Sequence, residues 1–139
     1  MVKKNLKKQK GVIIVYPSSR TRNLIKEIRN LGYVPIVIPT SKYDKFVLDM
    51  FDETCIQQFN SAIKSEEYKK YNPDIVEFDS DQDVNKIIKY TKNKYEILAV
   101  IPCSDPSLKI SDCLQKEFKP LDNVLTCVPF KLSAGMPAE

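Results

Sequence analysis

The sequence predicts an α/β fold, in which a parallel sheet of about four strands has helices on both faces. Two apolar runs, at residues 12–16 and 97–101, show no polar alternation, as is typical of strands covered on both sides. Each run ends in a polar turn, and apolar residues at helical spacing follow the turn. This strand–helix order recurs along the chain, and right-handed crossovers then require parallel strands.

The first half of the chain predicts two strands and the helices that follow them. A helix at about residues 21–31 follows the first strand, and Gly32 suits the position just after its last turn. The second strand is expected at residues 33–38. Its Pro35 removes a ladder hydrogen bond, which indicates the beginning of the strand or a place near a sheet edge. Residues 44–71 predict one broken helix or two short ones.

The second half repeats the same alternation. A short third strand is expected at residues 75–78, and a helix follows it from the acidic residues at 79–81 to about residue 93. The fourth strand, at 97–101, precedes a helix at 107–118, whose apolar stripe is expected to contain Leu108, Leu114 and Phe118. Together the elements predict a Rossmann-like three-layer sandwich with about four parallel strands and helices on both faces.

Charge and pattern divide the 139 residues into three parts. Residues 1–11 predict a basic disordered arm with five lysines, 12–123 a single α/β domain, and 124–139 an extension that resembles the start of a next domain. Of the 22 basic residues, 17 lie outside the arm and nearly balance the 18 acidic ones. We therefore interpret the arm as a solvated terminus, and do not expect a nucleic-acid partner.

The composition excludes several chemistries. The chain has no histidine, which removes Ser-His and Cys-His nucleophile systems and the usual zinc sites. Its three glycines form neither a phosphate loop nor a dinucleotide turn. No apolar run is long enough for a signal peptide or a membrane span, so a cytoplasmic protein is predicted. The four scattered cysteines predict reduced thiols, and Cys103 is interpreted as structural because no base is in sight.

Two polar turns carry the candidate site. Ser18, Ser19 and Arg20 follow the first strand, and Ser104 and Asp105 follow the fourth. Both strands are expected to be central in the sheet. Carboxyl ends of parallel strands share one edge, so we expect the turns to face each other across a crevice. Their hydroxyls, guanidinium and carboxylate suit a small zwitterion or carboxylate. The alternative is that the serines cap helices, Asp105 stabilises a helix dipole, and Arg20 is solvated.

Several segments, taken in order, resemble the N-terminal domain of ATP-grasp enzymes, the carboxylate–amine and carboxylate–thiol ligases. The first is VIIVYPSSR at residues 12–20, which is followed by a helix and GYVP at 32–35. The second is LAVIPCSD at 98–105, followed by ISDCL at 110–114 and LDN at 121–123. The turn at 102–105 lacks the usual glycine and has aspartate where the family commonly has glutamate.

The resemblance implies a function. In the parent enzyme the five turn residues would position a carboxylate substrate or face the nucleotide-binding domain. Two further domains of the family bind ATP and Mg²⁺, and the chain ends at residue 139, so we expect no ligase activity from it alone and no cofactor of its own. The missing ATP-grasp domains would be its partners, and an apolar patch near residues 124–132 would receive them. The alternative is a non-catalytic Rossmann-like module that binds a small ligand or a protein.

Overall fold

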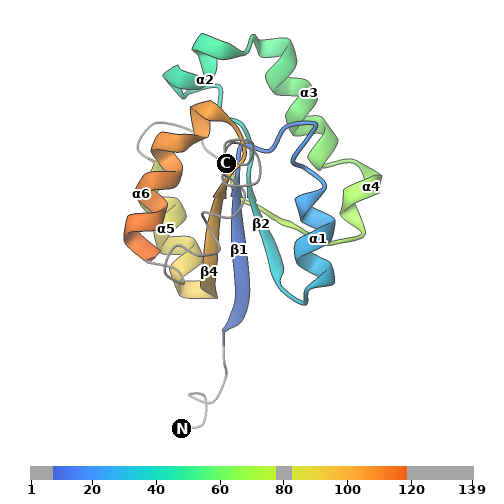
Figure 1. The fold of residues 1–139 in the computed structure, drawn as a ribbon, viewed down its shortest axis with the longest axis vertical. Coiled ribbons are helices and arrows are strands. Elements are labelled where there is room, and N and C mark those ends of the chain that lie inside the picture. Colours follow the sequence, from blue (N-terminus) through green and yellow to red (C-terminus); the bar gives the residue numbers. More distant parts are fainter. Residues whose placement is uncertain (1–7, 78–82, 119–139) are drawn as a thin grey trace, which may run out of the picture.

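The structure is a computed structural model that describes residues 8–77 and 83–118. Its sheet has four strands in the order β3-β2-β1-β4 (Figure 1), and every pair of neighbouring strands is parallel. The predicted α/β class and parallel sheet are confirmed. The strands are β1 (Gln9–Val15), β2 (Val34–Ile38), β3 (Asp74–Ile75) and β4 (Tyr95–Pro102).

Helices cover both faces of this sheet, which makes three layers. Figure 1 shows α5 and α6 on one side of the sheet and α1 and α4 on the other, while α2 and α3 extend beyond the carboxyl ends of the strands. The helices are α1 (Leu24–Asn30), α2 (Lys45–Met50), α3 (Glu53–Ile63), α4 (Glu66–Lys69), α5 (Asp83–Lys94), the short 3₁₀ helix η2 (Asp105–Ser107) and α6 (Leu108–Phe118).

The core consists of two apolar layers, one on each face of the sheet. Ile13 of β1 belongs to the layer that contains Ile87 of α5 and Leu114 of α6. The next residue, Ile14, belongs to the opposite layer with Ile25 of α1. Successive side chains of a strand point to opposite faces, and both isoleucines are fully buried. Burial of both faces explains why this strand shows no polar alternation.

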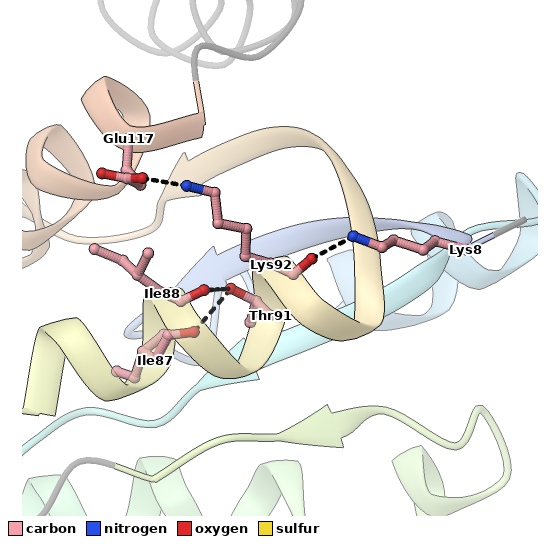
Figure 2. A network of polar contacts seen from close by, with 6 residues as sticks. All are labelled: Lys8, Ile87, Ile88, Thr91, Lys92 and Glu117. Carbon is pink, nitrogen blue, oxygen red and sulfur yellow. Dashed lines mark hydrogen bonds and ion pairs between the residues drawn. The ribbon is translucent and has the colours of Figure 1, made fainter. Parts of the chain in front are cut away.

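The end of α5 is tied to its neighbours by polar contacts (Figure 2). The buried Thr91 hydroxyl shares its single proton between the carbonyl oxygens of Ile87, at 2.8 Å, and Ile88, at 3.2 Å, so this donor is satisfied within the helix. Lys8 Nζ donates to the Lys92 carbonyl oxygen at 2.7 Å, and Lys92 Nζ pairs with Glu117 of α6 at 2.6 Å. Lys8 therefore contacts the folded domain, although the Lys92–Glu117 pair is exposed and adds little stability.

The strands differ from the sequence-based expectation in their bounds. β3 is Asp74–Ile75 instead of residues 75–78, and β4 is Tyr95–Pro102 instead of residues 97–101. β1 begins at Gln9, so Gln9, Lys10 and Gly11 belong to the sheet rather than to a free arm; they pair with the start of β4. Pro35 lies in β2, which is next to the edge strand β3, so the expected place near an edge is confirmed. Its other expectation, the beginning of a strand, is confirmed, because β3 pairs only with Ile36 and Val37 beyond the proline.

The helices differ mainly in their ends. The first begins at Leu24 rather than near residue 21, because a turn occupies the intervening residues. Residues 44–71 contain three helices instead of one or two. In α6 the buried residues are Ile110, Ser111 and Leu114, while Leu108, expected on the apolar stripe, is 45% exposed. The expected helix start at 79–81 and the patch near 124–132 lie outside the described residues.

Candidate functional site

The exit turns of β1 and β4 lie beside each other at the carboxyl edge of the sheet. Val15 and Pro102 are paired at the ends of the two strands, and the Cys103 N–H donates to the Val15 carbonyl oxygen at 3.0 Å. β1 has β2 on one side and β4 on the other, so the winding of the sheet reverses between β1 and β4. Ligands of open α/β sheets bind at such a point. However, β4 is the outer strand of the described sheet and not a central one, as had been expected.

Tyr16 holds the start of the β1 turn. Its φ angle of 56° lies in the left-handed region, which is unusual for a bulky residue. Two hydrogen bonds stabilise this conformation: the Tyr16 N–H donates to the Ile38 carbonyl oxygen at 2.8 Å, and its hydroxyl donates to Asp44 Oδ2 at 2.6 Å. Asp44 also accepts from the Phe46 N–H at 2.9 Å and so caps α2. The β1 turn is thereby tied to the β2 exit and to α2.

Of the predicted residues in this turn, Ser18 has a structural role and two are open to solvent. The Ser18 N–H donates to Thr21 Oγ1 at 2.7 Å, and the Ser18 carbonyl oxygen accepts from the N–H groups of Thr21 and Arg22. Ser18 and Thr21 therefore close the turn on each other. Ser19 and Arg20 are exposed, and Arg20 forms no ion pair within the part of the chain that the structure describes.

The β4 turn is closed by Ser107, which was not among the residues predicted for the site. Ser107 Oγ accepts from the Ser104 N–H at 3.3 Å and donates to the Ser104 carbonyl oxygen at 2.6 Å. Ser104 is partly buried and precedes η2 as its N-cap residue, whereas Asp105 is exposed in the first turn of η2. The Ser104 hydroxyl is buried and has no hydrogen-bond partner among the described residues, so it does not act as a cap there. Asp105 lies where the helix-dipole alternative expects it, and its carboxylate is accessible.

Cys103 lies between the two turns. Burial raises the pKa of its thiol to about 12, and a hydrogen bond with Thr21 only partly offsets this shift. At neutral pH the thiol is therefore protonated and a poor nucleophile, in agreement with the structural role predicted for it. Cys55 and Cys113 are also free thiols.

A separate hollow lies at the exits of β2 and β3. We call it the β2–α3 cavity; its volume is about 580 Å³, and none of the five predicted site residues lines it. Pro39, Thr40 and Ser41 contribute from the β2 exit. Glu53, Gln57 and Ser61 contribute from α3, on the helix face formed by residues three to four apart. The signal was present in the sequence, since a proline and two hydroxyl residues follow β2 much as they follow β1.

Two interactions hold the walls of this cavity together. Asn60 of α3 accepts from the Thr40 N–H at 3.0 Å and donates to the Thr40 carbonyl oxygen at 2.9 Å, so one side chain satisfies both main-chain groups of that residue. Lys64, just after α3, pairs with Glu77 after β3 at 2.6 Å. The first contact joins α3 to β2 and the second joins it to β3.

Comparisons with protein-family models, with curated proteins and with solved structures found no match to this chain. Among the residues that the structure describes, no three His, Cys, Asp or Glu side chains gather in a way that could hold a metal ion. No helix within residues 8–77 and 83–118 is long and apolar enough to cross a membrane.

Proposed function

We propose that this chain is the substrate-side N-terminal domain of an ATP-grasp carboxylate–amine ligase whose ATP-binding core lies outside these 139 residues. The observation that carries the proposal is the pairing of β1 with β4, which sets the two motif-bearing turns side by side. In the sequence these turns are more than 80 residues apart and carry the family resemblance. The strand order adds support, because it puts both turns at the position where open α/β sheets bind ligands.

Within this site the exposed side chains would contact the substrate. The Arg20 guanidinium is a planar donor that suits a carboxylate, and Ser19, the residue before it, also exposes a hydroxyl. The exposed Asp105 carboxylate would face an ammonium group or a neighbouring domain. Ser18 and Ser104 would position these groups, since their main-chain atoms close the two turns.

The described residues do not fit ATP and Mg²⁺. Gly11 lies within β1 and Gly32 just after α1, so neither belongs to a loop that cradles phosphate. The described part of the chain also gathers no set of carboxylates for a metal ion. In this proposal nucleotide and metal bind to other domains, and the chain alone has no ligase activity.

Thermal unfolding tests the proposal directly. The protein is heated with ATP and Mg²⁺, or with a panel of amino acids and small carboxylates, and unfolding is followed by far-UV circular dichroism. A ligand at ten times its Kd stabilises by about 1.4 kcal/mol, which raises the Tm by about 5 °C. We expect such a shift with a small carboxylate and none with nucleotide. A shift at micromolar ATP would contradict the absence of a nucleotide site.

Two variants locate the site. Arg20→Ala removes the proposed carboxylate contact and should abolish the ligand-induced shift. Lys26→Ala removes the same charge from an exposed position on α1 and should preserve it. If the shift survives in Arg20→Ala, the ligand does not bind at the β1–β4 edge and this assignment is wrong.

The second candidate function is a non-catalytic Rossmann-like module for a small ligand or a protein. The β2–α3 cavity favours it, because a hollow of about 580 Å³ is large enough for a metabolite and lies apart from the motif-bearing turns. If no ligand shift depends on Arg20 but another compound binds elsewhere, this second candidate replaces the first.

A further inference from the structure

Two residues that line the β2–α3 cavity have hydroxyl protons for which no acceptor is present among the described residues. Thr40 and Ser41 are each only 3% exposed and both line the cavity. Asn60 bonds the main chain of Thr40 and leaves its hydroxyl available. Ser41 Oγ accepts from the Tyr43 N–H at 3.0 Å, but its own proton has no acceptor among the described residues. Both residues line the cavity, so their hydroxyl protons can be donated to an acceptor that a ligand brings into it.

The charges around the cavity are of both signs, and two of them are unpaired. Lys64 and Glu77 neutralise each other at 2.6 Å. Lys42 and Glu53 also line the cavity but form no ion pair within the described ranges. Lys42 instead lies 5.7 Å from the centre of the Tyr43 ring. Within the described part of the chain, the cavity therefore offers one unpaired cation and one unpaired anion, both on exposed residues, together with two hydroxyl donors.

We propose that the β2–α3 cavity binds a small zwitterion, a compound that carries a carboxylate and an ammonium group a few bonds apart. The carboxylate accepts hydrogen bonds from the Thr40 and Ser41 hydroxyls and pairs with Lys42. The ammonium group pairs with Glu53, and the Gln57 amide, which has no hydrogen-bond partner among the described residues, contacts the remainder of the ligand. A volume of about 580 Å³ accommodates a molecule of this size.

The single unpaired lysine and single unpaired glutamate among the described residues of the cavity favour a zwitterion over other classes of ligand. A nucleotide or phosphate would bring two or more negative charges against one free lysine and one free glutamate. A neutral ligand would leave both charges without partners. The site shares no lining residue with the β1–β4 edge, so this inference is independent of the proposed ligase function.

The test is an NMR titration of the whole ¹⁵N-labelled chain, in which amide signals are followed in ¹H–¹⁵N correlation spectra. The probes are glycine, L-glutamine and γ-aminobutyrate, with acetate and methylammonium as the two half-molecules that carry one charge each. We expect a zwitterion to shift the amide signals of residues 40–43 and 57–61, and we expect these shifts to be the same whether or not the signals of residues 18–20 also move. Each half-molecule should bind at least about tenfold more weakly, because it forms only half of the charge contacts.

Conservative variants then assign the contacts. Lys42→Gln and Glu53→Gln should each weaken binding about fivefold, since each removes one exposed charge pair. Thr40→Val keeps the main-chain bonds to Asn60 and removes only the hydroxyl, so it should weaken binding without unfolding the protein, as judged by circular dichroism. Arg20→Ala should bind as the wild type does, which separates this site from the β1–β4 edge.

The inference is overturned if no zwitterion binds at millimolar concentration, if acetate binds as well as glycine, or if Lys42→Gln and Glu53→Gln leave the affinity unchanged. Binding that disappears in Arg20→Ala would move the ligand to the other site and refute this one.

Discussion

Removal of the Asn60 side chain should measurably destabilise the fold. Asn60→Ala leaves the Thr40 N–H and carbonyl oxygen without their partners, and Thr40 is only 3% exposed. An unsatisfied buried group costs about 1–3 kcal/mol, and the low end applies here because the adjacent cavity admits water; the two groups together cost about 2 kcal/mol. Alanine returns about 0.5 kcal/mol through its higher helix propensity. The free energy of unfolding should therefore fall by about 1.5 kcal/mol.

Urea unfolding followed by circular dichroism measures this change, provided that the m-value stays constant. Gln57→Ala is the matched control, because it removes a similar amide from the same helix and the same cavity but breaks no hydrogen bond among the described residues. It should change the free energy by less than about 0.5 kcal/mol. If both variants lose the same small amount, Asn60 does not hold the β2 exit and the reasoning fails.

Three further predictions follow from single positions. Gly32→Ala should destabilise by about 1–2 kcal/mol in urea unfolding, because φ is +94° and no neighbouring atom within 4 Å contributes a clash; an unchanged midpoint would contradict this. Burial and the hydrogen bond to Asp74 raise the pKa of Tyr95 to about 12, so the unfolded chain, with a pKa near 10, loses that proton first and stability should fall as pH rises from about 10 to 12. Tyr95→Phe should show a smaller fall, measured by urea unfolding across this pH range; an identical pH profile would refute the assignment. In a variant in which Cys55 and Cys127 are replaced by serine, Cys103 should react with iodoacetamide at least about tenfold more slowly than the exposed Cys113, because its thiol is partly buried and protonated; equal labelling rates would contradict the raised pKa.

The elements that the sequence predicted best are those whose signal is local. The run at residues 12–16 lacks polar alternation because Ile13 and Ile14 are buried on opposite faces, and hydrophobic periodicity reports this directly. Burial that depends on contacts with distant segments was not predicted correctly. Leu108 had helical spacing but is exposed, while Ser111 takes a buried place in the same helix.

The candidate site was predictable only in part, for a related reason. Parallel strands end at one edge, so the turns after β1 and β4 were expected at the same end of the molecule, and the structure makes the two strands neighbours. That Ser18 closes its turn on Thr21, and that Ser107 rather than Ser104 closes the second turn, depends on backbone angles that residue type does not determine. The sequence also could not predict that the Thr40 hydroxyl is left without a partner among the described residues. That depends on Asn60, 20 residues away, whose side chain binds the Thr40 main chain instead.

By itself the sequence determined the class of the fold. The spacing of apolar residues identifies strands and helices locally, and the repeated strand–helix order requires a parallel sheet. It also determined which chemistries are absent, because a chain without histidine cannot form the sites that need it. Only the tertiary structure decided the strand order β3-β2-β1-β4, and with it which exit turns meet. Only the tertiary structure reveals the β2–α3 cavity. The cavity lies between the exit of β2 and α3, and contacts between such distant segments produce no periodic pattern in the sequence.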